Sequence, residues 1–291
     1  MDKFSINGPC RVRGTIKLSG SKNASLPILA ASILFDEPVE IKNLPKVKDI
    51  ETMLNLIKSL GFSIKKNKIK NSVIIKKKKI KTFASYSLVK TMRAGILVLG
   101  PLISKYKKAT TSLPGGCLIG ARPVNFHLNA LGKLGMTHSI KKGYIYANAH
   151  KGLKGSIIKF PKISVGATEN AILAATLAKG KTILKNCAIE PEIKIDLTNF
   201  LNKAGAKIKW MGKRSVEIDG VKKLNSISYS VMADRIECGT FCVVAAISKG
   251  ELKINGLDPN IITTEIKLLK KIGAKIKTYD KTILIKGPTK I

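Results

Sequence analysis

The sequence has few acidic residues, few aromatic rings and few histidines. Asp and Glu number 18 against 53 Lys and Arg, which gives a formal charge of +35, and aromatic residues make up 5% of the chain. Such a charge is typical of proteins that bind nucleic acid or membrane surfaces. The lysines are spread through nearly every segment, however, and no aromatic cluster offers the stacking surface that single-strand binders use. We therefore expect a solvated basic surface that favours small anionic substrates, with neither nucleic acid nor membrane as partner.

Further absences restrict the class of protein. No Cys-x-x-Cys pair occurs among the five cysteines, and no histidine lies near Cys238 and Cys242, which are one helical turn apart. This usage predicts a reducing compartment, without a disulfide framework or a metal site. The first residues lack the apolar core of a signal peptide, and no apolar run reaches the roughly 20 residues that span a bilayer. The sequence thus predicts a soluble, cytoplasmic protein.

The stretch from Ser112 to Pro123 holds two prolines, three glycines, one cysteine and one arginine. Proline and glycine at this density exclude a regular helix or a central strand, so we expect a loop between two helical runs. Glycine lets backbone N–H groups approach an anion, Arg122 can bind phosphate or carboxylate, and nearby cations make the Cys117 thiol more reactive. The alternative is a plain surface connection with an incidental thiol. The other cysteines are expected to be small core residues: Cys10, Cys187, Cys238 and Cys242.

One pattern of about 70 residues recurs four times along the chain. A helix rich in Ala and Leu is followed by a strand, by a second helix that ends before a glycine, and by another strand. Repetition on this scale predicts an α/β architecture built of several similar units. The alternating stretch from Phe4 to Leu18, ahead of the first repeat, predicts a short pair of strands. The first helices are expected to begin near Lys22, Lys90, Gly166 and Arg235, and the second to end at Leu60-Gly61, Leu134-Gly135, Ala204-Gly205 and Ile272-Gly273.

Six motifs carry a resemblance to a known family: Ser21-Lys22-Asn23-Ala24, Leu88 to Ala94, Leu113 to Pro123, Ser164 to Asn170, Glu190-Pro191-Glu192-Ile193, and Asp234 to Thr240. The sequence resembles the enolpyruvyl transferases, in the branch that acts on UDP-N-acetylglucosamine, over its whole length. The thiol loop separates this branch from 5-enolpyruvylshikimate-3-phosphate synthase. The resemblance implies an α/β fold, an inside-out barrel of repeated units with helices inside and sheets outside.

The resemblance also implies a division into domains. Residues 22–231 correspond to a complete domain of three repeats that carries the thiol loop and the sugar-nucleotide segments. Residues 1–21 and 232–291 correspond to part of a second domain. Because the family has six repeats and four are present here, the chain is expected to be a fragment, one product of a split gene, or the product of a decayed gene. A separate C-terminal fragment is among the expected partners.

In this family the enolpyruvyl group of phosphoenolpyruvate is transferred to the 3-hydroxyl of UDP-N-acetylglucosamine, with release of phosphate, as the first committed step of peptidoglycan synthesis. Carried over motif by motif, the resemblance makes Cys117 the proton donor to C3 of phosphoenolpyruvate and the site of a covalent adduct. It implies neither a metal nor another cofactor. The residues implied for phosphoenolpyruvate are Lys22, Asn23 and Arg122. Those implied for UDP-N-acetylglucosamine are Arg93, Arg122, Pro123, Val124, Asn125, Phe126, Lys162, Ile163, Ser164 and Val165.

Several of these residues also have a plain structural interpretation. Lys22 can be a surface lysine, although a cation is poorly placed at a helix start, which indicates an anion nearby. Arg93 can be a side chain that extends from an apolar helix to solvent. Asp49 and Glu190 are either polar residues of the cleft or ordinary carboxylates at helix starts. The histidines show no partner pattern and are expected not to be catalytic: His127, His138 and His150.

Two features depart from the family's pattern. Ile189 stands where an arginine commonly precedes the Glu-Pro-Glu motif. No residue of this chain can be assigned as the base for the sugar hydroxyl, or as the further arginines that hold phosphoenolpyruvate. A UDP-sugar-binding remnant without activity is therefore the alternative to a transferase, while a basic nucleic-acid binder would rest on charge alone.

Overall fold

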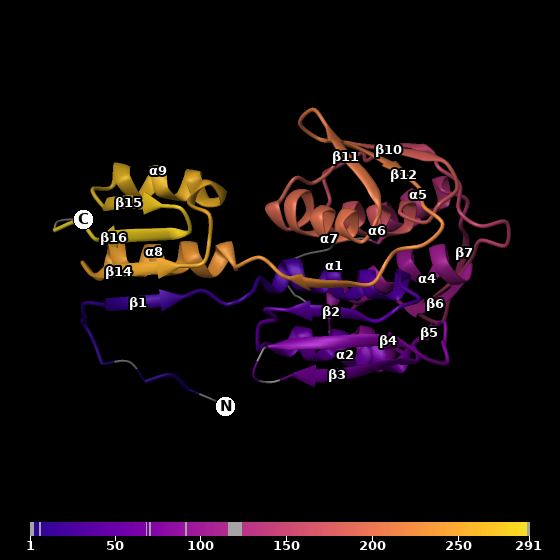
Figure 1. Cartoon of the computed structure of the whole chain (residues 1–291), viewed down its shortest axis with the longest axis horizontal. Coiled ribbons are helices and arrows are strands. Elements are labelled where there is room, and N and C mark those ends of the chain that lie inside the picture. The colour runs from indigo at the N-terminus through magenta and orange to yellow at the C-terminus, as the bar shows by residue number, and fades with distance from the viewer. Residues whose placement is uncertain are drawn as a thin grey trace. The chain divides into compact units, whose positions relative to one another are not determined.

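Four sheets of four strands each organise the part of the chain that this computed structural model describes, which is residues 3–5, 7–67, 69, 71–90, 92–115 and 124–289. The chain divides into two compact units. The large unit is Lys22–Val231, and the small unit combines Met1–Ser21 with Met232–Ile291. Three of the sheets belong to the large unit and one to the small unit (Figure 1).

Each sheet has the following strands, in spatial order. The first consists of β13 (Ile227–Ser230), β2 (Val39–Lys42), β4 (Ser72–Lys77) and β3 (Phe62–Asn67). The second consists of β5 (Phe83–Ala84), β6 (Lys108–Ser112), β8 (Tyr144–Asn148) and β7 (Thr137–Lys141). The third consists of β9 (Ile157–Lys159), β10 (Lys181–Lys185), β12 (Ser215–Asp219) and β11 (Lys207–Met211). The sheet of the small unit consists of β1 (Arg13–Lys17), β14 (Glu251–Asn255), β16 (Thr282–Lys286) and β15 (Lys275–Tyr279).

All four sheets share one topology. An edge strand runs parallel to its neighbour, as β13 does to β2 and β1 does to β14, and two antiparallel strands complete the sheet. The repeat predicted from the sequence is therefore confirmed at the level of strand pairing. Among the described residues, no hydrogen-bonded strand pair links one sheet to another, so the sheets do not form one closed barrel. Within the large unit, the last repeat is nevertheless joined to the first: β13, from the end of the third repeat, pairs with β2 of the first repeat.

The helices follow the same repeat. In the large unit they are α1 (Lys22–Ala31), η1 (Ser32–Leu34), α2 (Lys48–Ser59), α3 (Tyr86–Val89), η2 (Arg93–Val98), α4 (Leu99–Tyr106), α5 (Asn125–Lys133), α6 (Val165–Ala175), η3 (Glu192–Leu197) and α7 (Thr198–Lys203). In the small unit they are α8 (Arg235–Ile247), η4 (Pro259–Ile262) and α9 (Thr263–Lys271). The second helix of each repeat is followed by a glycine whose positive φ other residues rarely adopt, which explains the Leu-Gly and Ala-Gly signal in the sequence. These φ values are +92° at Gly61, +103° at Gly135, +98° at Gly205 and +94° at Gly273.

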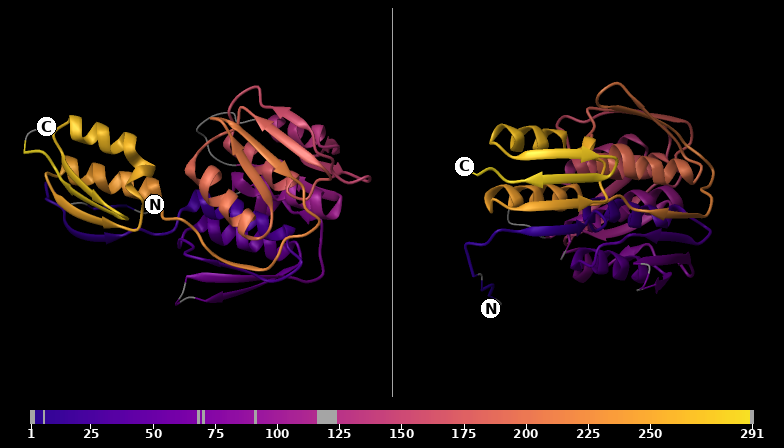
Figure 2. Two further views of the ribbon diagram at one scale, coloured as in Figure 1. Left: turned by 45° about the horizontal axis from the view of Figure 1, so that its top comes forward. Right: turned by 60° about the vertical axis from the view of Figure 1, so that its left-hand side comes forward.

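Helices form the centre of the large unit, with its sheets around them (Figures 1 and 2). In α1 every residue from Ala24 to Ala31 is buried, and in α6 every residue from Ala167 to Ala175. Helix α4 packs against α6, and α1 packs against α2. The predicted arrangement of helices inside and sheets outside is therefore confirmed for this unit.

In the small unit, α8 and α9 pack against one face of the sheet, and Cys238 and Cys242 lie in the core between them. Two expectations for this unit were wrong. The stretch from Phe4 to Leu18 contributes one strand among its described residues, β1, because its partner β14 lies far along the chain rather than in a local hairpin. Cys10 is exposed and not part of the core, because it precedes β1 in a segment without regular structure.

Candidate functional site

Lys22 and Asn23 are the first two residues of α1, which is buried from its third residue onward. The Nζ of Lys22 lies 3.0 Å from the Oδ2 of Asp49, in the first turn of α2. The structure therefore supplies a counter-charge where a cation is otherwise poorly placed at a helix start. Asp49 lies in the first turn of its own helix and is an ion-pair partner of Lys22, and its place in a substrate cleft stays a prediction. Asn23 is exposed beside this pair.

Arg93 opens η2, which packs against α1 and α6. Its side chain is partly buried, and its positive charge helps to lower the pKa of His127 in α5. The charge of the guanidinium is therefore felt at the start of α5, where the predicted residues Val124, Asn125 and Phe126 lie. Val124 is the residue before the helix, and Asn125 is exposed at its first position.

The third predicted segment leads into α6. Lys162 and Ile163 are exposed, and Ser164 caps the helix: its Oγ accepts a hydrogen bond from the backbone N–H of Ala167 at 3.4 Å. Val165 is the first helical residue and is exposed, whereas the rest of α6 turns into the core. A helix N-terminus with free N–H groups and a lysine just before it favours an anion.

Helices α5 and α6 meet close to their N-termini. A Cβ on Gly166 would lie 3.1 Å from Cε1 and 3.3 Å from Nε2 of His127, so only glycine lets the imidazole come so near without displacement. The 124–126 segment and the 162–165 segment therefore lead into neighbouring helix starts, where His127 lies beside Gly166. The charge of Arg93 affects His127 at this position.

Cys117, Arg122 and Pro123 lie in 116–123, outside the described residues, so their roles stay predictions. The described start of the loop is held in place. The backbone N–H of Leu113 donates to the carbonyl of Gly143 at 2.8 Å. A Cβ on Gly115 would lie 2.4 Å from the carbonyl oxygen of Lys90, a clash that explains the glycine at this position.

A buried pair that no sequence motif predicted lies behind this region. His127 is 7% exposed, and its Nδ1 lies 3.1 Å from Nδ2 of Asn170 in α6. Burial, with the nearby charge of Arg93, lowers the pKa of His127 to about 4. The sequence showed no partner pattern for His127, and the structure supplies one in Asn170, while the expectation that His127 is not catalytic stays a prediction. Two signals pointed to the pair: His127 directly follows the predicted 122–126 stretch, and Asn170 ends the motif that begins at Ser164.

Three glutamates lie where α6 approaches the start of η3: Glu169 and Glu192 are buried, and Glu190 is partly buried. Burial, and then the charges of Glu192 and Glu190, raise the pKa of Glu169 in α6 well above its usual range. The Oε2 of Glu190 is buried and has no hydrogen-bond partner. Glu190 is thus more than a solvated carboxylate at a helix start. The pKa shift of Glu169 favours its protonated form in the folded protein.

Comparison with known proteins identifies the family. The sequence-family model of EPSP synthase (3-phosphoshikimate 1-carboxyvinyltransferase) matches residues 6–291 of this chain. UDP-N-acetylglucosamine 1-carboxyvinyltransferase from Pelagibacter ubique is 60% identical over 291 residues, which are 100% of this chain and 69% of the relative. The chain belongs to the enolpyruvyl transferases. Within them it groups with the UDP-N-acetylglucosamine 1-carboxyvinyltransferases, as the motifs predicted; that of Baumannia cicadellinicola is 48% identical over 96% of this chain and 66% of its own length.

Solved enolpyruvyl transferases share the fold. The enolpyruvyl transferase NikO from Streptomyces tendae matches with a TM-score of 0.86 and 19% identity, over 98% of this chain and 68% of that one. EPSP synthase from Acinetobacter baumannii matches with a TM-score of 0.78 and 19% identity, over 97% and 66%. The predicted fold is confirmed. The chain spans about two thirds of the length of the curated relatives it matches.

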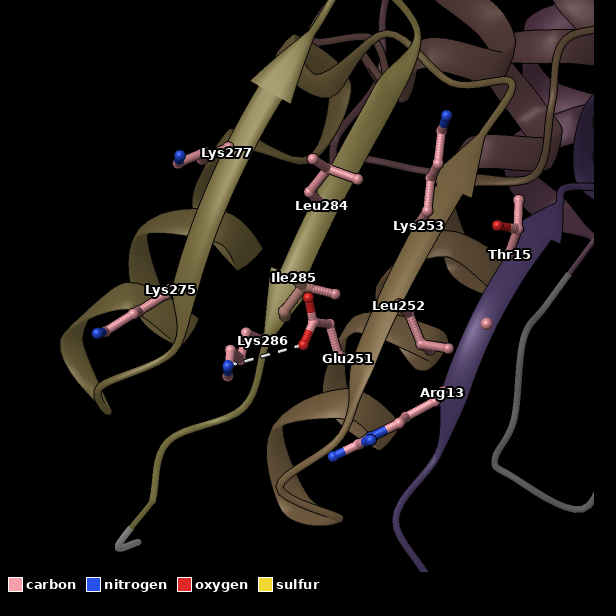
Figure 3. A pocket seen from close by; sticks show the side chains of 11 residues that line it. Arg13, Thr15, Glu251, Leu252, Lys253, Lys275, Lys277, Leu284, Ile285 and Lys286 are labelled. Atoms are coloured by element: carbon pink, nitrogen blue, oxygen red, sulfur yellow. Dashed lines mark ion pairs between the residues drawn. The ribbon is translucent and has the colours of Figure 1, made fainter.

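A basic groove of about 660 Å³ lies elsewhere, on the open face of the small unit's sheet (Figure 3). Its carboxylate, Glu251, lies 3.7 Å from the Nζ of Lys286. No described residue that the enolpyruvyl transferase motifs assign to a substrate lines it. The cations in the groove are Arg13, Lys253, Lys275, Lys277 and Lys286.

Across the described ranges, no helix has the length and apolar character to cross a bilayer, and no group of three or more His, Cys, Asp or Glu side chains is arranged to hold a metal.

Proposed function

We propose that this chain binds phosphoenolpyruvate and UDP-N-acetylglucosamine and takes part in transferring the enolpyruvyl group to the 3-hydroxyl of the sugar. The observation that carries the proposal is the 60% identity to a UDP-N-acetylglucosamine 1-carboxyvinyltransferase over every residue of the chain. The reaction would be the first committed step of peptidoglycan synthesis, in the cytoplasm, and would link the chain to cell-wall formation, cell shape and division.

In the proposed reaction, Cys117 donates a proton to C3 of phosphoenolpyruvate, and the 3-hydroxyl oxygen, losing its own proton, bonds to C2. The bond from C2 to the phosphate oxygen then breaks, C3 loses a proton, and the double bond forms again. A free thiol has a pKa near 8.5, so at neutral pH it is mostly protonated and can act as the acid. Lys22 and Arg122, with the amide of Asn23, would hold the anionic groups of phosphoenolpyruvate.

The sugar nucleotide would bind where α5 and α6 begin. Its diphosphate would be held by Lys162 and by the backbone N–H groups after Ser164, since a helix N-terminus favours phosphate. Arg93 would provide a further cation on the side of α5. The remaining contacts would come from Arg122 to Phe126, Ile163 and Val165.

A second candidate is a unit that binds the sugar nucleotide without turnover. It is favoured because the resemblance to the family assigns none of the residues of this sequence as the base for the sugar hydroxyl. Both candidates require UDP-N-acetylglucosamine to bind, and they differ in phosphate release from phosphoenolpyruvate.

Calorimetry with UDP-N-acetylglucosamine tests the proposal. We expect saturable binding to the 291-residue chain, weakened about tenfold or more by Lys162→Ala, because a charge-assisted contact to phosphate is lost. Lys159→Ala is the matched control, since Lys159 is an exposed lysine of the neighbouring strand β9, and should leave the affinity unchanged. Absence of saturable binding, or tighter binding to single-stranded DNA that weakens steeply with salt, would contradict the proposal.

A further inference from the structure

The side chain of Asn170 has one possible orientation. One of its terminal atoms lies 2.7 Å from the backbone N–H of Gly100, and the other lies 3.1 Å from the carbonyl oxygen of Ile96. The N–H requires an acceptor and the carbonyl requires a donor, so the first atom is Oδ1 and the second is Nδ2. A Cβ on Gly100 would lie 2.2 Å from Oδ1, so glycine is what allows this close approach of α4 to α6.

This orientation fixes the tautomer of His127. Nδ2 of Asn170 is a donor and lies 3.1 Å from Nδ1 of the imidazole, so Nδ1 must accept and carries no proton. The proton of the neutral ring is then on Nε2. Burial and the charge of Arg93 oppose a second proton, which agrees with the hydrogen-bond pattern.

The Nε2 edge of the His127 ring lies beside Gly166, at the start of α6. The Nε2–H makes no hydrogen bond to a described residue, although the side chain is more than nine-tenths buried and Nε2 lies against Gly166. The backbone N–H groups of Val165 and Gly166, in the first turn, have no acceptor within the helix either. Three donors thus gather at one place, while Ser164 caps the N–H of Ala167.

We propose that the Nε2–H of neutral His127 donates a hydrogen bond to a diphosphate oxygen of the sugar nucleotide at the start of α6, and that Asn170 is the positioning residue that fixes this donor. The inference rests on the proposed function for the place of the ligand, and it adds a binding residue and its tautomer. A neutral donor suits a buried position, because Lys162 and Arg93 already supply charge and a buried imidazolium would be costly.

The first test observes the wild-type chain by 15N NMR of the histidine rings, before and after UDP-N-acetylglucosamine is added. We expect Nδ1 of His127 to show the shift of an unprotonated nitrogen and Nε2 that of a protonated one. Addition of the nucleotide should move the Nε2 resonance, whereas that of the exposed His150 should stay in place. A protonated Nδ1, or an Nε2 resonance that does not respond to bound nucleotide, would overturn the proposal.

The second test compares variants by calorimetry and thermal unfolding. His127→Phe keeps a planar aromatic ring and removes the donor, so the Kd for UDP-N-acetylglucosamine should rise about five- to tenfold. His127→Gln offers an amide N–H and should recover part of that loss. Equal affinity in wild type and folded His127→Phe would refute the role of Nε2, while wild-type binding itself would still support the proposed function. If His127→Phe does not fold, the NMR result decides.

Discussion

The ammonium of Lys22 and the carboxylate of Asp49 form a 3.0 Å ion pair between the first turns of α1 and α2. Both side chains are about two-fifths exposed, at 44% and 39%, so solvent screens the pair and its net contribution to stability is small. The pair holds the cation at a helix start, where only an opposite charge makes it favourable. A substrate anion at this place would therefore meet a lysine that is already oriented.

Replacing Lys22 with Gln is expected to weaken phosphoenolpyruvate binding at least tenfold, because a charge-assisted contact to the phosphate or carboxylate is lost. The thermal midpoint should change little, since an exposed ion pair contributes about 0.2–1 kcal/mol. Calorimetry in the presence of UDP-N-acetylglucosamine measures the effect. Lys58→Gln, at an exposed position in the last turn of α2, is the control, and equal affinities for the two variants would contradict the assignment of Lys22.

The thiols should differ sharply in reactivity. Cys187, Cys238 and Cys242 are buried, and burial raises the pKa of Cys187 to about 12, so mild alkylation of the folded chain should leave all three intact. Cys10 is exposed and should react, which makes Cys10→Ser the suitable background. In that background peptide mapping should find the label on Cys117, at a rate slowed by UDP-N-acetylglucosamine. Preferential labelling of a buried thiol would argue against the site.

Replacing Glu169 with Gln should stabilise the large unit increasingly as the pH rises. The pKa of Glu169 is raised in the folded state, so folding binds a proton above the ordinary value of 4.5, and this contribution to stability is lost as the pH climbs through the folded pKa. Gln does not titrate. The difference in thermal midpoint between variant and wild type should therefore grow as the pH rises above about 4.5, and should level off once the pH exceeds the folded-state pKa of Glu169. Glu51→Gln, at an exposed position of α2, should show no such trend.

Turnover by the 291 residues alone should be slow. The resemblance assigns the acid and part of the cation set to this chain but no base for the sugar hydroxyl, and a positioned base contributes about 10²–10⁴ in rate. A phosphate-release assay beside the full-length Pelagibacter ubique relative measures the difference. Rates within a few-fold of each other would mean that a residue of this chain acts as the base and has not been recognised.

The sequence was informative where the signal is local. The glycines after α2, α5, α7 and α9 have positive φ, so helix ends could be located from Leu-Gly and Ala-Gly pairs. The strand that pairs with β1 could not be predicted from the sequence, because β14 follows β1 by more than two hundred residues and no local pattern encodes such pairing. The Cys10 error has the same origin, since exposure depends on what packs nearby.

The site divides in the same way. Motifs predict substrate roles for Lys22, Arg93 and Ser164, and the structure places each at the first turn or cap of a helix. The partners of these groups come from other helices, as Asp49 does for Lys22 and Asn170 does for His127. The His127–Asn170 contact depends on Gly166 and Gly100, two positions where a missing Cβ admits a neighbouring side chain, and such contacts appear only once the helices are packed.

The backbone N–H of Ser21 donates to the carbonyl of Met232 at 2.8 Å, so the chain leaves the small unit and returns to it at neighbouring points. The large unit is in this sense an insertion whose two junctions are side by side. Removing residues 22–231 as a block leaves ends that a short linker can rejoin. Conversely, joining Val231 to Lys22 makes a closed ring that can be opened at a surface turn such as Lys142-Gly143, between β7 and β8. The peptide bonds 21/22 and 231/232 are therefore suitable positions for gene fusion, splitting and circular permutation of this chain.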